Sequence, residues 1–292
     1  MRSRLILKRM AHSKLFIVGA TITLAMCIIV ILAPVLIYHD PTEANLAARL
    51  TPPQWFSAGR EGNILGTDQM GRDILARLLI GAQESFSIAI VCIILSSIIG
   101  TAIGVIAGYY GGVLDQLLMR ISEVFLAIPT MTLGIVVMAI LGTTASNLVF
   151  VMVVTMWVSY AKLMRNNVSV MRNKEFVQAS KVLGAKDLYI MFRQILPNIT
   201  TPLIILLSQS FGAVILAEAS LSFLYLGIQP PAPSWGNMIA SGREYLTVAP
   251  WMSTAPGVML MVTVLGFNFL GDGLRDVLDP KQQHSRMGSR RT

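Results

Sequence analysis

MRNKEFVQASKVLGAKDLYIMFRQILPN, residues 171–198, is the longest charged interval between two apolar blocks of this chain. Small or apolar residues at helical spacing (i, i+3, i+4, i+7) form one face of a predicted helix: Phe176, Ala179, Ser180 and Leu183. We expect Gly184 to end this helix, Lys186-Asp187 to begin a second, and Pro197 to end that one. Such a module outside a membrane suits docking into a groove of a soluble partner, although a plain basic loop between two membrane spans has the same composition.

Composition places the rest of the chain in lipid. Of its 292 residues, 54% are hydrophobic and only 13% are charged, against roughly 25% charged in a soluble domain. Cys27 and Cys92 lie inside apolar runs, which indicates packing residues and no disulfide. The three histidines are scattered, without the spacing of metal ligands. Neither a metal site nor nucleic-acid binding is therefore expected.

Six apolar runs predict an all-α integral membrane protein with six transmembrane helices, because one span needs about 20 apolar residues. These helices are expected within residues 15–274, near 15–38, 85–108, 124–141, 147–164, 199–221 and 252–271. A polar link at 109–123 precedes the third, which Pro129 should bend near its start. Glycines at every fourth position of the second helix predict close approach of another helix: Gly100, Gly104 and Gly108.

The basic residues predict which side of the membrane each segment faces. Only five of the 23 lysines and arginines fall in segments expected outside: Arg49, Arg60, Arg72, Arg77 and Arg243. The others lie in an N-terminal tail (1–14), at Arg120, in residues 162–193 and in a C-terminal tail (275–292). The positive-inside rule then places both termini and residues 171–198 in the cytoplasm.

Acidic residues in two places, in residues 65–77 and at Glu218, each allow two roles. In LGTDQMGRDILAR (65–77) a turn and a helix start are expected, with Asp73 as the cap and a salt bridge to an arginine; a divalent-cation site is matched only loosely. Glu218 lies near the far end of the fifth span. A charge at the bilayer centre costs roughly 2.5–3.5 kcal/mol, so Glu218 either faces a polar pathway or lies at the membrane rim.

Catalytic motifs are missing from the sequence. The dipeptide Gly-Lys of a phosphate-binding loop never occurs, and neither a His-Glu-x2-His nor a Gly-x-Ser-x-Gly motif is present. The chain is therefore expected not to be an enzyme, and the energy for any uphill transport should come from a partner.

Several segments together resemble the inner-membrane permease subunit of binding-protein-dependent ABC importers, in the dipeptide/oligopeptide/nickel class and as the second permease of the pair. The matching segments are LGTDQMGRD (65–73), GYYGGVLDQLLMR (108–120) with LAIP (126–129), VQASKVLGAKDLYIMFRQILPN (177–198), ASLSFLYLGIQPPAPSWG (219–236) and FNFLGDGLRDVLDP (267–280). The resemblance runs from the first span to Pro280.

This resemblance implies that residues 171–198 are a cytoplasmic coupling-helix loop between helices 4 and 5, which docks into an ATPase subunit. The positions matched to docking are Gln178, Ala179, Ser180, Leu183, Gly184, Leu196 and Pro197. The chain departs from the family pattern at three places. Gln178 replaces an acid, which removes a salt bridge and leaves a hydrogen bond; Ser180 replaces alanine; and Tyr225 stands where glycine is usual.

The resemblance also implies partners and a location in the bacterial inner membrane. The partners are a second permease, two ATP-binding subunits that hold ATP and Mg²⁺, and an extracytoplasmic solute-binding protein; this chain itself would hold no cofactor. The implied cargo is di- or oligopeptides, with nickel or another small solute as alternatives. A self-contained secondary carrier is the other class considered, and Glu218 is its candidate coupling residue.

Overall fold

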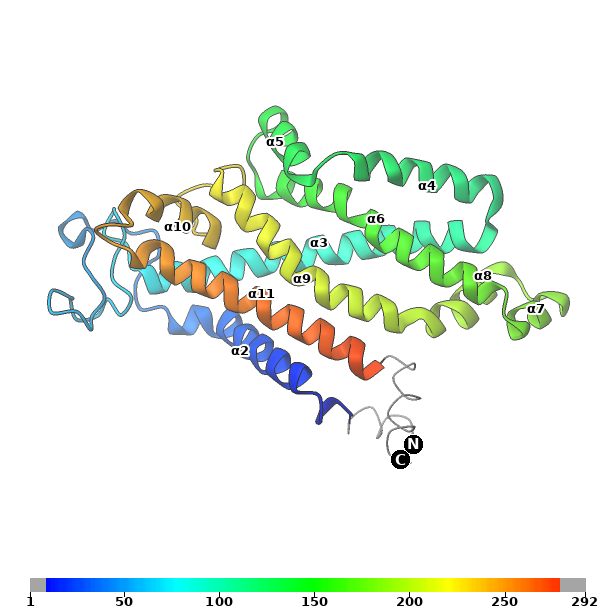
Figure 1. The fold of residues 1–292 in the computed structure, drawn as a ribbon. Coiled ribbons are helices and arrows are strands. Elements are labelled where there is room, and N and C mark those ends of the chain that lie inside the picture. Colours follow the sequence, from blue (N-terminus) through cyan, green and yellow to red (C-terminus); the bar gives the residue numbers. More distant parts are fainter. Residues whose placement is uncertain (1–8, 279–292) are drawn as a thin grey trace.

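The computed structural model describes residues 9–278, and its regular elements are helices (Figure 1). The α-helices are α2 (Lys14–Leu36), α3 (Ile74–Tyr110), α4 (Gly112–Ala127), α5 (Thr130–Leu141), α6 (Ala145–Arg172), α7 (Glu175–Val182), α8 (Asp187–Tyr189), α9 (Thr200–Phe223), α10 (Trp235–Gly242) and α11 (Trp251–Leu278). This confirms the all-α prediction. Most of the two predicted tails, 1–14 and 275–292, lies outside the described residues, as does Pro280.

In the part of the chain that the structure describes, five helical segments are long and apolar enough to cross a membrane: Lys14–Leu36, Ile74–Tyr110, Ala145–Arg172, Asp187–Phe223 and Trp251–Leu278. A sixth span results if α4 and α5, which meet at an angle of 81°, count as one. The six-helix prediction therefore corresponds to five or six candidate spans.

The bend between α4 and α5 lies at Pro129, as predicted. Ile128 has an extended backbone (φ −98°, ψ 119°), the conformation that a residue before proline prefers, and Pro129 is the N-cap of α5. The bounds of the neighbouring elements differ from the expectation. The link expected at 109–123 is largely the helix α4, and α3 begins at Ile74 rather than near 85, because the Asp73 carboxylate accepts from the Ala76 backbone N (2.8 Å) and caps it there.

Glycines set the closest helix pairs. Carbon atoms added as Cβ at Gly100 and Gly104 would overlap backbone oxygens of α6, and one at Gly108 would lie 2.6 Å from the Arg165 oxygen. The predicted glycine face of α3 is thus confirmed, with α6 as its partner. In the same way, Gly19 of α2 lies against the backbone of α11 at Leu270. Small residues let helix backbones approach within a membrane, where burial of apolar surface gives no advantage over lipid.

The two ends of the bundle carry different structures (Figure 1). At one end lie the irregular segment 37–73 and α10, and at the other lie α7 and α8. The α10 segment is held on α3 by Trp235, which is fully buried and donates its indole N–H to the Leu78 carbonyl (3.0 Å). We call these the α10 end and the α7 end.

Candidate functional site

The α7 end carries the helix–glycine–helix module expected from the sequence. Helix α7 ends as predicted: Gly184 N–H donates to the Lys181 oxygen (3.1 Å) and Ala185 N–H to the Ser180 oxygen (3.1 Å). These two bonds form a Schellman motif, which requires a left-handed residue, and Gly184 has φ +81°. A Cβ at Gly184 would meet nothing within 4 Å, so its glycine serves the backbone turn and no close contact within this chain.

Val177 fastens α7 to the bundle. It is almost fully buried and packs in one cluster with Tyr109 of α3, Val168 of α6 and Ile190 beyond α8. Phe176, the first residue of the predicted apolar face, is instead 46% exposed. The face predicted from the spacing therefore points away from the chain's own core, and a neighbouring face buries the helix.

The two departures from the family pattern that lie in the module, Gln178 and Ser180, both make internal hydrogen bonds. The Gln178 side-chain amide donates to the Arg172 backbone oxygen (2.9 Å), a bond that an acceptor-only carboxylate could not form. The Ser180 hydroxyl accepts from the Gln194 amide (2.7 Å) and donates to the Phe176 oxygen (3.0 Å). These bonds tie α7 to the end of α6 and to the segment after α8.

The second short helix begins at Asp187, as expected, but the prediction that Pro197 ends it is wrong. The chain continues from α8 through a π-helical turn (Ile190–Ile195) and a 3₁₀ turn (Leu196–Ile199) directly into α9. Pro197 lies in the first turn of the 3₁₀ segment, where the missing N–H of proline interrupts no α-helical bond. The module is therefore continuous with a candidate membrane span.

Polar contacts fix the base of the module on α3 and α6. The Tyr109 hydroxyl donates to the Asp187 carboxylate (2.6 Å), and the Arg172 guanidinium donates to the Tyr109 backbone oxygen (2.8 Å). Because Asp187 opens α8 and Arg172 closes α6, one tyrosine at the end of α3 joins the three elements.

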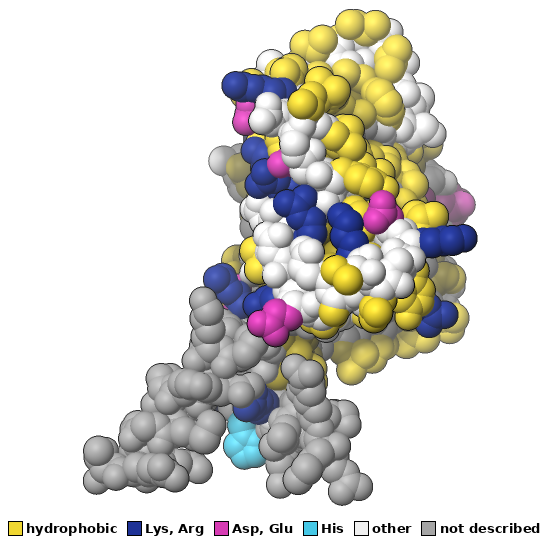
Figure 2. Space-filling view, turned by 90° about the vertical axis from the view of Figure 1, so that its right-hand side faces the viewer, with side chains coloured by type: hydrophobic (Ala, Val, Ile, Leu, Met, Phe, Trp, Pro, Cys, Tyr) yellow, Lys and Arg dark blue, Asp and Glu magenta, His cyan; other side chains and the backbone are white. Residues whose placement is uncertain are grey.

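The outer surface of the module is apolar with a basic border. Val182 and Leu183 are 87% and 86% exposed. Further exposed apolar side chains are Phe176, Leu188, Tyr189 and Phe192, and exposed bases are Lys174, Lys181, Lys186 and Arg193. Figure 2 shows lysine and arginine gathered on this end of the molecule. A contiguous exposed apolar patch with a polar border is typical of an interaction site, and we call it the module surface.

The predicted docking residues differ in their solvent exposure. Those exposed are Gln178, Ala179, Leu183, Gly184 and Pro197, whereas Ser180 and Leu196 are half-buried. Sequence reasoning missed Val182, Leu188 and Phe192, which enlarge the module surface. The i, i+4 spacing of Leu188 and Phe192 is the signal that could have identified the last two.

Glu218 lies away from the module, fully buried in α9. Its two carboxylate oxygens accept hydrogen bonds from Ser85 of α3 (2.8 Å) and Ser222 of α9 (2.7 Å). Ser222 also accepts from the Ile228 backbone N–H (3.2 Å), so the carboxylate helps to hold the turn before α10. No lysine or arginine among residues 9–278 forms an ion pair with Glu218. Glu218 thus lies in the interior of the chain, and both expected roles, facing a polar pathway and lying at the membrane rim, stay predictions.

Tyr225 has φ +58°, the left-handed conformation that glycine adopts without strain. It follows α9 in the turn that Ser222 holds, where its backbone N–H donates to the Ser222 oxygen (3.0 Å). The turn expected from the family's glycine is therefore present with a tyrosine in it.

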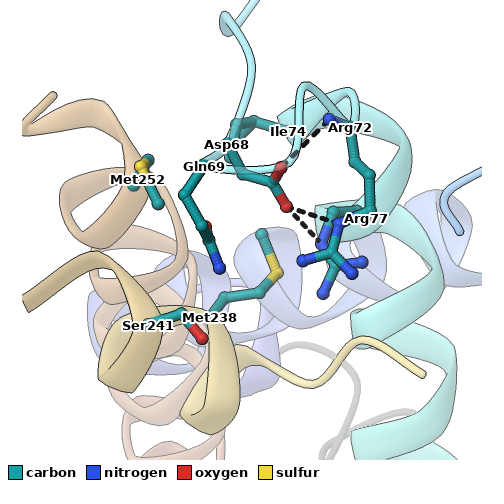
Figure 3. A pocket seen from close by; sticks show the side chains of 8 residues that line it. All are labelled: Asp68, Gln69, Arg72, Ile74, Arg77, Met238, Ser241 and Met252. Carbon is teal, nitrogen blue, oxygen red and sulfur yellow. Dashed lines mark hydrogen bonds and ion pairs between the residues drawn. The ribbon is translucent and has the colours of Figure 1, made fainter. Parts of the chain in front are cut away.

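A buried charge cluster lies at the α10 end, around a small pocket (Figure 3). The Asp68 carboxylate oxygen Oδ2 accepts a hydrogen bond from Arg72 Nε (2.7 Å) and lies 3.5 Å from Arg77 Nε. All three side chains are buried. Arg77 also donates to the Pro41 oxygen (2.9 Å). The expected salt bridge is thus formed by Asp68, while Asp73 is the helix cap. Since Asp68 is already satisfied by arginine and backbone donors, the cluster fastens segment 37–73 to α3.

Comparison with known families gives two matches. Residues 100–284 match the binding-protein-dependent transport system inner membrane component, and residues 2–53 match the N-terminal transmembrane domain of oligopeptide transport permease C. Together these matches include the module, α9, α10 and α11.

Curated relatives cover almost the whole chain. A dipeptide transport system permease protein of Haemophilus influenzae is 42% identical over 265 residues, which is 91% of this chain and 90% of the relative. A di/tripeptide transport system permease protein of Pseudomonas aeruginosa is 38% identical, covering 94% and 91%. A glutathione transport system permease protein of Pectobacterium atrosepticum is 41% identical, covering 74% and 72%.

Among solved structures, a chain of the MetNI methionine ABC transporter in an inward-facing conformation superposes with a TM-score of 0.56. The sequences are 19% identical, and the match covers 69% of this chain and 96% of that chain. At this identity the likeness establishes a shared fold alone.

Proposed function

Because the chain belongs to the family of binding-protein-dependent transport system inner membrane components, we propose that it is the permease subunit of an ATP-driven importer for di- or oligopeptides, coupled through residues 171–198 to separate ATPase subunits. The peptide cargo is inferred from relatives of 38–42% identity that are named for dipeptide or di/tripeptide transport. Nickel or another small solute is the alternative cargo for the same architecture.

The module surface is the observation that carries the coupling proposal. Its apolar centre, with Val182 and Leu183 almost fully exposed, has no covering element in the described chain. Burying such a centre in a groove of a soluble subunit removes apolar area from water, and the surrounding lysines orient the partner. Since α8 continues into α9, a displacement of this surface acts directly on a membrane helix.

The partner set follows from this assignment. Two ATP-binding subunits would supply ATP and Mg²⁺, a second permease would complete the membrane assembly, and an extracytoplasmic binding protein would deliver the solute at the α10 end. Both termini would lie in the cytoplasm with the module. This chain would supply the route and the mechanical connection, and its partners the hydrolysis.

The proposal is tested with a matched pair of variants at Gly184. Asparagine and aspartate both tolerate the left-handed backbone and have nearly the same shape, and a Cβ at this position meets nothing within 4 Å among residues 9–278. Gly184→Asp adds a charge to the desolvated contact, whereas Gly184→Asn adds none. We expect ATP-dependent dipeptide uptake by the co-expressed assembly in vesicles to fall at least about tenfold for Asp and less than about threefold for Asn.

Co-purification and hydrolysis separate the possible results. Wild type should co-purify with ATPase subunits, and the Asp variant should lose them or hydrolyse ATP without uptake. Wild-type uptake by Gly184→Asp would refute docking through this surface. Uptake by the wild-type chain purified alone without ATP would instead indicate a secondary carrier. Replacing the dipeptide with Ni²⁺ in the same assay decides between the two cargoes.

A further inference from the structure

The Tyr109 hydroxyl makes a connection that the path of the chain does not supply. Helices α7 and α8 follow α6 and precede α9, so the backbone itself joins the module to those two helices. Helix α3 is remote in sequence, and Tyr109 precedes Asp187 by 78 positions. Among residues 9–278, the bond from the Tyr109 hydroxyl to Asp187 Oδ1 (2.6 Å) is the one side-chain hydrogen bond that joins α7 or α8 to α3.

The Tyr109 side chain is held firmly in place. It is buried, at 6% exposure, in one apolar cluster with Val177 of α7 and Ile190 beyond α8. Its backbone oxygen accepts from the Arg172 guanidinium at the end of α6 (2.8 Å). Since the ring has little room to turn, its hydroxyl stays at a fixed position relative to α3. A displacement of Asp187 therefore acts on the end of that helix.

Helix α3 runs from the module to the α10 end without interruption (Figure 1). Its 37 residues include no proline, the commonest cause of a kink, and at 1.5 Å per residue the helix is about 55 Å long. Near its first turn, the Leu78 oxygen accepts from the indole of Trp235 in α10 (3.0 Å), and Arg77 donates to the Pro41 oxygen (2.9 Å). One rigid element is thus bonded to both ends of the bundle.

Helix α3 is also tied to α9 at a distance from the module. Ser85 of α3 donates to the buried Glu218 carboxylate of α9 (2.8 Å). Helix α9, which the backbone joins to the module, cannot shift against α3 at this level without breaking that bond. The two helices should therefore move together, and Tyr109 supplies the matching tie at the α7 end.

We propose that Tyr109 is a positioning residue for transport: its bond to Asp187 makes α3 follow the module, so that a displacement driven by the ATPase subunits reaches α10. The inference rests on the proposed function and names the residue and the helix through which it acts. A hydroxyl bonded to a carboxylate at 2.5–2.7 Å is roughly twice as strong as a neutral hydrogen bond, and the 2.6 Å separation lies in that range. The bond is thus suited to transmitting a displacement.

Two adjacent tyrosines give a matched test. Tyr109→Phe removes the hydroxyl and keeps the buried ring. Tyr110→Phe is the control, because Tyr110 is 52% exposed and its hydroxyl forms no hydrogen bond with another residue of 9–278. In the assembled importer both variants should retain the ATPase subunits. Dipeptide uptake per ATP hydrolysed should fall at least about fivefold for Tyr109→Phe and less than about twofold for Tyr110→Phe.

The acceptor side of the bond provides a rescue experiment. Asp187→Asn keeps an oxygen that can accept from the Tyr109 hydroxyl, whereas Asp187→Ala does not. The asparagine variant should therefore give more uptake per ATP than the alanine variant. In chains that also carry Tyr109→Phe the two should be equal, because the hydroxyl that distinguishes them is gone. A difference that persists without the hydroxyl would mean that Asp187 acts independently of Tyr109.

A cysteine at the α10 end reports whether the displacement arrives. Ser241 is half-buried beside Arg72 and Arg77 in the wall of the small pocket (Figure 3). In a chain with Cys27→Ala and Cys92→Ala, a charged methanethiosulfonate should modify Ser241→Cys at a rate that ATP with vanadate changes at least about fivefold. The same chain carrying Tyr109→Phe should show no such change, although it still hydrolyses ATP.

Three results would overturn the proposal. Equal uptake per ATP in Tyr109→Phe and Tyr110→Phe would mean that the hydroxyl does not act in coupling. A lower melting temperature or loss of ATPase subunits in Tyr109→Phe, with normal uptake per ATP in the complexes that form, would mean a structural role alone. A reaction at Ser241→Cys that ignores ATP, or that responds equally without the hydroxyl, would mean that α3 does not carry the displacement. The proposed function is judged separately, by ATP-dependent uptake of the wild-type chain.

Discussion

Tyr225 shows how one residue can carry strain for a turn. A left-handed backbone costs a non-glycine residue roughly 1–2 kcal/mol, and Tyr225 has φ +58°. Tyr225→Gly should therefore raise the free energy of unfolding by about 1 kcal/mol, measured as a higher melting temperature in detergent. Tyr38→Gly is the control, because Tyr38 is exposed and is not among the residues with positive φ. A loss of stability at Tyr225 equal to that of the control would show that tyrosine contacts outweigh the strain.

Two substitutions at Glu218 separate the effect of losing its charge from the effect of losing its hydrogen-bonding group. Glu218→Gln keeps an oxygen acceptor for one of the two serines and offers an amide N–H donor to the hydroxyl oxygen of the other, whereas Glu218→Ala leaves both hydroxyls without a partner there, at about 1–3 kcal/mol for each unsatisfied group. We expect the glutamine variant to assemble and melt like wild type and the alanine variant to melt at lower temperature. If the glutamine variant assembles but loses uptake, Glu218 acts in transport. If the glutamine variant fails to assemble, or melts at as low a temperature as the alanine variant, the prediction is wrong.

At the scale of elements, the pairing of α3 with α6 depends on the absence of side chains. A Cβ at Gly104 would overlap the Ala161 oxygen, whereas a Cβ at Gly257 of α11 would meet nothing within 4 Å. Gly104→Ala should therefore lower the melting temperature in detergent by several degrees, because two backbones must separate. Gly257→Ala should be neutral or slightly stabilising, since alanine favours a helix over glycine by about 1 kcal/mol. Equal melting of the two variants would contradict close packing at Gly104.

Local signals explain which elements were predictable. The end of α7 at Gly184, the start of α8 at Asp187 and the bend at Pro129 each follow from the conformational limits of a residue or its position. The helical path through Pro197 was not predictable in this way, because π and 3₁₀ turns absorb the proline. Spacing alone also could not tell which face of α7 is buried, since that depends on Tyr109 and Ile190, which are distant in sequence.

The partners of the buried charged residues were also not predictable from local sequence. Ser85 and Glu218 meet across 133 positions of sequence, and Arg77 reaches the Pro41 carbonyl 36 positions away. Its place in an apolar run singled out Glu218, and the pattern of residues 65–77 predicted a salt bridge to an arginine. Their partners depend on how the helices pack, which no local pattern records.

At the scale of the whole molecule, the two ends of the bundle should face opposite sides of the membrane. In the chain with Cys27→Ala and Cys92→Ala, Asn173→Cys marks the α7 end and Thr247→Cys the α10 end, and both positions are exposed. A membrane-impermeant maleimide should label Thr247→Cys on intact cells and Asn173→Cys only in inverted vesicles. Labelling of Asn173→Cys from outside intact cells would reverse the proposed orientation.

The unbroken path from α8 into α9 also has a geometric consequence. The α-helical part of this path, α9 (Thr200–Phe223), is about 36 Å long at 1.5 Å per residue, and the π-helical and 3₁₀ turns before it connect it to the module surface. A tilt of about 5° in a rod of that length shifts its far tip by roughly 3 Å, the rise of two helical residues. That tip carries Glu218 and Ser222 and leads into the turn before α10. A rotation imposed on the module would thereby reach the turn before α10, at the opposite end of the bundle.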